Sequence, residues 1–179
     1  MEEQKIFNGG LQTVPQIATP QIIYLDFDGE LTAYHGEIET VEHVTVADSN
    51  LSAERIAYIV GELNNQFAAQ NVIFVTEKPV SADFSTIFVG KSDAFSAYGD
   101  FQGVAETLDS NNQNPTDNAF VLLDSTAQDS AIIATIAHEA GHLLGTLNHG
   151  GEGLQAYAAT TSLHRFRYRY SSYAGGKWS

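Results

Sequence analysis

The chain has 179 residues, of which 43% are hydrophobic, and its formal net charge is −14. The length fits one domain with a sizeable core, and the negative charge argues against a nucleic acid or an anionic membrane surface as a partner. The lack of cysteine excludes disulfides and thiolate metal ligands, and no apolar run in the sequence approaches the length of a membrane span.

Residues 1–20 contain two glycines and two prolines without periodicity, which predicts an extended lead-in. The first ten residues, MEEQKIFNGG, are polar and acidic and do not look like a signal peptide. Either the protein is cytoplasmic or a signal segment has been removed. We expect the second, a secreted or cell-surface protein of a bacterium, because such proteins can lack cysteine. The last residues, YAGGKWS, lead us to expect a piece of a longer protein.

Residues 21–27, QIIYLDF, are apolar and rich in β-formers, which predicts a strand ending in Asp26, Asp28 and Gly29. The stretch LDFDGELT resembles the first motif of haloacid-dehalogenase-type phosphatases, D-x-D-G-T. That resemblance implies that Asp26 is a nucleophile and Asp28 a general acid, both assisted by Mg²⁺. Glu30 replaces the threonine, however, and no lysine or acidic-pair motif follows. The other interpretations are a polar turn after the strand, and metal or structural use of the two aspartates.

Residues 31–50 predict an exposed hairpin with a strand at 41–47. His35 and His43 are expected on its surface rather than in a metal site.

A long helix is predicted in LSAERIAYIVGELNNQFAAQN, with Ser49, Asn50 or Ser52 as its N-cap and an end near Asn71. Its apolar residues recur at helical spacing and indicate core packing. They are Ile56, Ile59, Val60, Leu63 and Phe67.

Buried strands are predicted at 72–76, 85–89 and 119–124. The segment 91–118 is long and irregular, with room for a short strand at 103–107, and a loop of this length is functional or mobile. The alternation of strands and helices predicts an α/β (α+β) fold, with helices packed on a mixed, mostly parallel sheet.

The segment 131–151, AIIATIAHEAGHLLGTLNHGG, carries the strongest chemical signal. Apolar residues at helical spacing predict a helix. They are Ile132, Ile133, Ile136, Ala137, Ala140, Leu143 and Leu144. His138 and His142, four residues apart, share one face of that helix and can hold one metal ion. Neutral imidazole suits Zn²⁺, and Glu139 can act as a general base on a zinc-held water without being a ligand.

Gly145 follows where the helix can end in a left-handed turn, after which the chain would return His149 toward the metal. The alternative is an ordinary amphipathic helix with polar histidines. Two histidines and a glutamate in an otherwise apolar helix are costly to bury without a partner, however, and a metal supplies one.

The stretch HEAGHLLGTLNH resembles the signature of the metzincin zinc peptidases, H-E-x-x-H-x-x-G-x-x-H. The residues that match are His138, Glu139, His142 and Gly145. The third-ligand position holds Asn148, and the histidine comes one residue later, at His149. Because an amide is a poor zinc ligand, we expect a longer turn that presents His149, with His164 or a water as the alternatives.

Metzincins also carry a methionine turn beneath the metal, whereas the only methionine here is the first residue. Ser162 and Leu163 are the candidates for that place. Residues 163–170, LHRFRYRY, alternate arginines with aromatics, which predicts a strand whose aromatics pack on the core. The resemblance would instead make this strand the lower wall of a cleft, with Tyr168 or Tyr170 near the metal or an oxyanion.

The resemblance implies one catalytic domain. A metzincin-like subdomain at 21–149 would contain a twisted, mostly parallel sheet, a long backing helix and the active-site helix. A short C-terminal subdomain would follow at 150–179. The strand within 103–107 would be an edge strand that pairs with an extended peptide through main-chain hydrogen bonds.

The implied function is that of a zinc-dependent endopeptidase acting on a protein or peptide. One Zn²⁺ would be held by His138, His142 and His149, with Glu139 as the catalytic base. Ca²⁺ could bind to clustered carboxylates, but no loop has the aspartate spacing of a calcium motif. The rival interpretations are a catalytically silent metal-binding module, a structural zinc domain with four protein ligands, and the phosphatase described above.

Overall fold

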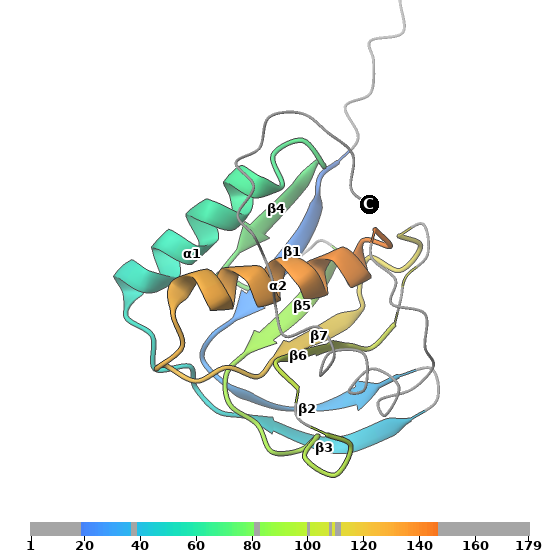
Figure 1. The fold of residues 1–179 in the computed structure, drawn as a ribbon. Coiled ribbons are helices and arrows are strands. Elements are labelled where there is room, and N and C mark those ends of the chain that lie inside the picture. The colour runs from blue at the N-terminus through green and yellow to red at the C-terminus, as the bar shows by residue number, and fades with distance from the viewer. Residues whose placement is uncertain are drawn as a thin grey trace, which may run out of the picture.

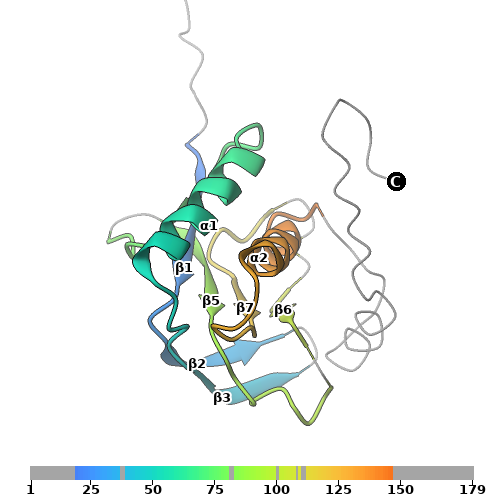
Figure 2. The ribbon, with the colours of Figure 1, turned by 60° about the vertical axis from the view of Figure 1, so that its left-hand side comes forward.

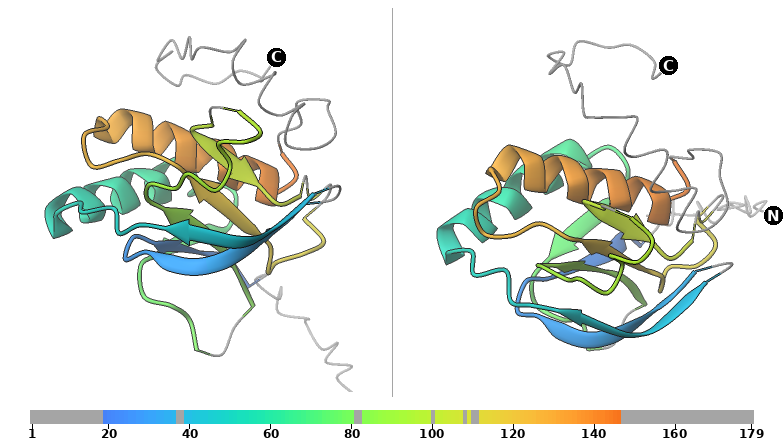
Figure 3. Two further views of the ribbon diagram at one scale, coloured as in Figure 1. Left: turned by 90° about the horizontal axis from the view of Figure 1, so that it is seen from below. Right: turned by 60° about the horizontal axis from the view of Figure 1, so that its bottom comes forward.

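The computed structural model describes residues 19–36, 39–80, 83–99, 101–107, 109 and 112–146. Most of the predicted lead-in and all of the predicted C-terminal subdomain, 150–179, lie outside these residues. The described part has three layers, which are two helices, a five-stranded sheet and a two-stranded hairpin (Figure 1, Figure 3).

The central sheet has five strands in the spatial order β4-β1-β5-β7-β6. They are β1 (Gln21–Asp26), β4 (Val72–Val75), β5 (Phe84–Val89), β6 (Gly103–Ala105) and β7 (Asn118–Val121). Neighbouring strands run parallel, except that β6 lies antiparallel to β7 at one edge. The predicted mixed, mostly parallel sheet is therefore confirmed, together with the short strand predicted within 103–107.

Both helices pack on the same face of the sheet (Figure 1, Figure 2). Helix α1 (Ala53–Gln66) contacts β4, and helix α2 (Asp129–Leu143) contacts β5, β6 and β7. The predicted apolar residues of both helices line one core with Ile23, Ile87 and Val121 of the sheet. Neither helix of the described part has the length and apolarity that crossing a membrane requires.

The hairpin of β2 (Glu30–His35) and β3 (Thr40–Val46) covers the opposite face of the sheet as a separate antiparallel pair. Aromatic residues fill the space between the hairpin and the sheet. The ring of Tyr34 lies 5.4 Å from that of Phe95 and 6.2 Å from that of Phe120, measured between centroids. The predicted hairpin and its second strand are confirmed, whereas the sequence did not define the first strand.

Helix α1 begins after Ser52, one of the three predicted caps, whose hydroxyl accepts a backbone N–H of the first turn at 3.4 Å. The helix ends at Gln66, earlier than the predicted end near Asn71. Asn64 bonds the N–H and C=O of Phe74 at 2.9 and 3.0 Å, and Asn71 takes a left-handed φ of 56°. These interactions turn the chain back along the helix into β4.

Candidate metal-binding site

Helix α2 brings two histidines together in its C-terminal half. Nε2 of His138 and Nε2 of His142 lie 3.2 Å apart, and the rings meet edge to face with centroids 4.8 Å apart. Two imidazole nitrogens bound to one tetrahedral Zn²⁺ at about 2.05 Å would be separated by about 3.3 Å. The observed spacing therefore suits a shared ion. It also suits an N–H···N hydrogen bond in which one ring holds its proton on Nε2.

Glu139 lies on the side of α2 that meets the edge strand β6. A Cβ atom placed on Gly103 would be 2.8 Å from Cδ and 2.9 Å from Cγ of Glu139, so the glutamate side chain rests against this strand. Glu139 is 1% exposed and His142 is fully buried, while His138 is half-buried. The candidate base is thus next in sequence to one histidine and in contact with the edge of the sheet.

The predicted left-handed turn at Gly145 is confirmed, with a φ of 65°. The N–H of Gly145 donates to the C=O of His142 at 3.0 Å, and the N–H of Thr146 donates to the C=O of Gly141 at 2.8 Å. This pair of bonds is a Schellman motif, in which glycine avoids the strain that a side chain would meet. The turn ends the helix within one turn of His142.

Several predicted site residues lie outside the described part of the chain. They are Asn148, His149, Ser162, Leu163, His164, Tyr168 and Tyr170. Within the described ranges, which stop at residue 146, no group of three histidine, aspartate or glutamate side chains is placed to hold an ion. The structure therefore brings His138 and His142 together and places the Glu139 side chain beside Gly103 of β6, and the third ligand stays a prediction.

Two acidic side chains that the sequence did not single out are buried in the segment between β6 and β7. Glu106 accepts the backbone N–H of His35 at 2.9 Å and two N–H groups of Asn118 at 3.1 and 3.0 Å. Asp109 accepts a backbone N–H of its own loop at 2.7 Å. The N–H of Asp109 donates to the C=O of His142 at 3.3 Å, so this loop contacts the C-terminal end of α2.

A third buried acid, Asp117, accepts the hydroxyl of Ser85 at 2.7 Å and that of Thr107 at 3.5 Å. Burial raises the pKa of Asp117 to about 6, although the hydrogen bond from Ser85 acts to lower it. The negative charges of Asp109 and Glu106 raise this pKa further. Burial also raises the pKa of Glu106, although its hydrogen bonds oppose the shift. The only sequence signal for these acids was the length of their irregular segment, which predicts function or mobility but not burial.

The start of α2 is fixed by Arg55 of α1. Its Nε donates to Oδ1 of Asp129 at 2.7 Å, and its two terminal nitrogens donate to the C=O groups of Ser125 at 2.9 Å and Ala127 at 2.7 Å. Asp129 lies in the first turn of α2, where a negative charge favours the helix dipole. Arg55 thus holds the helix at the end opposite to the histidines.

The D-x-D-G stretch after β1 forms a polar turn. Oδ1 of Asp26 accepts the N–H of Asp28 at 3.1 Å. Gly29 has a φ of 83°, and a Cβ there would lie 2.8 Å from a carbonyl oxygen of β3. Aspartate and glycine are therefore explained by local structure. His35 and His43 are exposed on the hairpin, as predicted.

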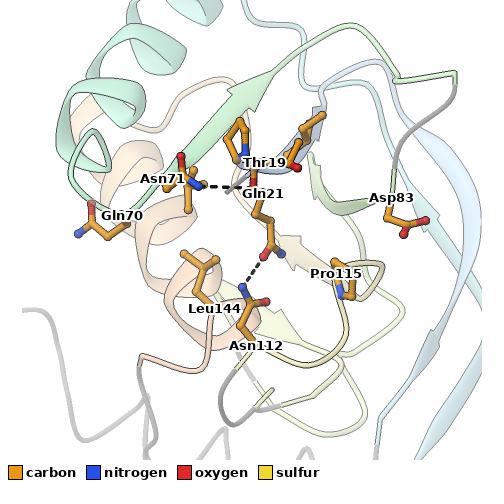
Figure 4. A pocket seen from close by; sticks show the side chains of 11 residues that line it. Thr19, Gln21, Gln70, Asn71, Asp83, Asn112, Pro115 and Leu144 are labelled. Carbon is orange, nitrogen blue, oxygen red and sulfur yellow. Dashed lines mark hydrogen bonds between the residues drawn. The ribbon is translucent and has the colours of Figure 1, made fainter. Parts of the chain in front are cut away.

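An open pocket of about 470 Å³ lies where β1 and β4 begin, next to the end of α2 (Figure 4). Side chains on its wall include Gln21, Gln70, Asn71, Asp83, Asn112 and Leu144. Gln21 accepts a hydrogen bond from Asn112 and donates one to Ser85 at 3.2 Å. Among the described residues of the candidate metal site, neither the two histidines nor Glu139 lines this pocket.

Comparison with protein-family models, with curated proteins and with solved structures finds no match. The chemistry of α2 and its contact with β6 are therefore the basis for a functional conclusion.

Proposed function

We propose that this protein is a zinc-dependent endopeptidase in which His138 and His142 bind the metal and Glu139 is the general base. The observation that carries the proposal is the 3.2 Å spacing of the two Nε2 atoms on one helix face, next to a carboxylate that is 1% exposed. His149 is the proposed third ligand, because the turn at Gly145 redirects the chain shortly before it.

The donor set fits zinc, since two imidazoles hold nitrogen atoms at the separation that one tetrahedral ion requires. Bound Zn²⁺ would supply a Lewis acid that lowers the pKa of a coordinated water toward neutrality. Glu139 accepts a proton from the attacking water and then donates it to the leaving amine. Its burial removes the carboxylate from bulk solvent, which strengthens its interaction with a nearby cation or proton.

The edge strand β6 supports a peptide substrate. The C=O of Gln102 accepts the N–H of Leu122, and the N–H of Glu106 donates to the C=O of Asn118. Alternate residues of this segment therefore face β7. The N–H and C=O groups of Gly103 and Ala105 therefore point away from β7, toward the outer side of β6, which is the edge strand of the sheet in the described part. An extended peptide that adds to this edge passes Glu139, whose side chain touches Gly103.

The test is to measure hydrolysis of an unfolded protein substrate together with the zinc content of each variant. We expect Glu139→Ala to keep zinc and to lose cleavage by about 10²- to 10⁴-fold, which is the usual contribution of general acid–base catalysis. We expect His142→Ala to lose both zinc and cleavage. The matched control is His43→Ala, because His43 is exposed on the hairpin and should affect neither.

The alternatives give different results in the same experiment. Undiminished cleavage by the Glu139→Ala variant contradicts the proposed mechanism. Zinc in the wild-type protein without cleavage of any unfolded substrate favours a silent metal-binding module. Hydrolysis of a phosphate ester that requires Mg²⁺ and Asp26 favours the phosphatase.

A further inference from the structure

We infer that Gly103 is a positioning residue for Glu139, because the lack of a side chain at this point of the edge strand creates the space that the general base occupies. The inference rests on the proposed function of the site.

The backbone conformation does not explain the glycine. Glycines with positive φ in the described part are Gly29, Gly99 and Gly145, and Gly103 is not among them. An alanine could therefore adopt the same backbone, and strands favour alanine over glycine. The reason for glycine at position 103 is space rather than conformation.

The space beside Gly103 is filled by one side chain. The three atoms nearest to a Cβ at this position are Oε1, Cδ and Cγ of Glu139, with Cδ at 2.8 Å and Cγ at 2.9 Å. Carbon atoms in ordinary contact lie about 3.5–4.0 Å apart. Because no backbone atom is among these three, an added methyl group would displace the glutamate rather than the strand.

The helix that carries Glu139 has little freedom to follow such a displacement. Ala140 and Leu143 are fully buried in the helix-side core, and Arg55 ties the start of α2 to α1. The carboxylate itself must therefore move, while the neighbouring His138 stays in place. A misplacement of about 1 Å in a catalytic group costs about 10²-fold in rate.

The test compares Gly103→Ala with the wild-type protein in zinc content, melting temperature, and kcat and KM for a fluorogenic peptide. We expect unchanged zinc content, a melting temperature within about 5 °C, and an unchanged KM. We expect kcat to fall by about 10²-fold. Gly61→Ala is the matched control, because a Cβ on this exposed glycine of α1 meets nothing within 4 Å. It should leave all four quantities unchanged or raise the melting temperature.

A second pair of variants separates positioning from general damage. Glu139→Asp shortens the side chain of the base by one methylene group, so the single variant should have a lower kcat. In the double variant, the shorter side chain no longer reaches the methyl group that Gly103→Ala adds. We expect the Gly103→Ala/Glu139→Asp double variant to have the kcat of Glu139→Asp, without a further loss. Such non-additivity is the mark of two residues that act through one contact.

Each other outcome overturns the inference. These outcomes are an unchanged kcat in Gly103→Ala, losses that multiply in the double variant, a rise in KM at constant kcat, and the loss of a folding transition. A wild-type protein that cleaves no peptide overturns the proposed function as well. Cleavage by the wild type with an unaffected Gly103→Ala variant overturns only the role of Gly103.

Discussion

Asp117 is a buried carboxylate whose charge opposes folding. It is 2% exposed, and burial raises its pKa from the ordinary value of 3.8 to about 6. The native protein therefore binds this proton more tightly than the unfolded chain does. Through this group, the free energy of unfolding is highest below pH 4 and falls as the pH rises to about 6.

Asp117→Asn removes this pH dependence, because the amide is uncharged and its oxygen can still accept the hydroxyl of Ser85. We expect the unfolding free energies of the two proteins to be similar near pH 4 and to diverge up to pH 7. Above that pH the variant should be more stable by up to roughly 3 kcal/mol. Urea unfolding at a series of pH values measures the difference, in which contributions common to both proteins cancel. Parallel curves would contradict the raised pKa.

The sequence placed the candidate site residues on helix α2 more successfully than it predicted the residues that surround them. His138, Glu139, His142 and Gly145 belong to a short local pattern whose spacing defines a helix face and its end. Buried acids such as Asp117 belong to an irregular segment, so their burial depends on contacts with strands far away in the chain. Asp117 accepts the hydroxyl of Ser85, a residue 32 positions away in the sequence. A local sequence pattern cannot predict a contact at that separation.

One arginine of α1 ties the start of α2 to the first helix. Arg55 makes three hydrogen bonds to the segment that begins this helix, and its side chain is 31% exposed. The planar guanidinium of Arg55 donates to a carboxylate and to two carbonyl groups at once, which the single ammonium group of a lysine cannot do in the same geometry. Arg55 therefore holds the two helices in register, while the Schellman turn at Gly145 closes the other end.

We expect Arg55→Ala to lower the free energy of unfolding by roughly 2–3 kcal/mol, because it leaves Asp129 and two carbonyl groups without their charged donor. Arg55→Lys should lie between this variant and the wild type. The control is Lys78→Ala, since the exposed Lys78 lies 3.9 Å from Glu30 and should contribute less than about 1 kcal/mol. Chemical denaturation measures all three. An Arg55→Ala variant with wild-type stability would show that α2 is positioned by core packing alone.

Strands and helices with strong hydrophobic patterns were predicted from the sequence, whereas the first hairpin strand and the end of α1 were not. β1, β5 and β7 are apolar runs, and both helices have clear apolar faces. β2 is different, because its outward residues are polar apart from Leu31, which is 66% exposed. The chain after α1 is held by hydrogen bonds between the Asn64 side chain and the backbone of Phe74 in β4. The spacing of apolar residues along a helix does not predict such bonds.

Across the whole molecule, the candidate site lies where α2, the edge strand β6 and the loop at Asp109 meet, on the helix side of the sheet (Figure 2). The chain carries a net charge of −14, so a bound dication would offset part of its self-repulsion. An ion that binds the native protein and not the unfolded chain also adds its binding free energy to the stability of the fold.

The most direct test of zinc binding by α2 is elemental analysis of the purified, dialysed protein and of three histidine variants. We expect about one zinc per chain in the wild type and in the His43→Ala control, and almost none in His138→Ala. His149→Ala should hold much less zinc than the wild type, since it removes the proposed third ligand. A wild-type protein without zinc, or a His138→Ala variant that keeps its full zinc content, would contradict the shared ion.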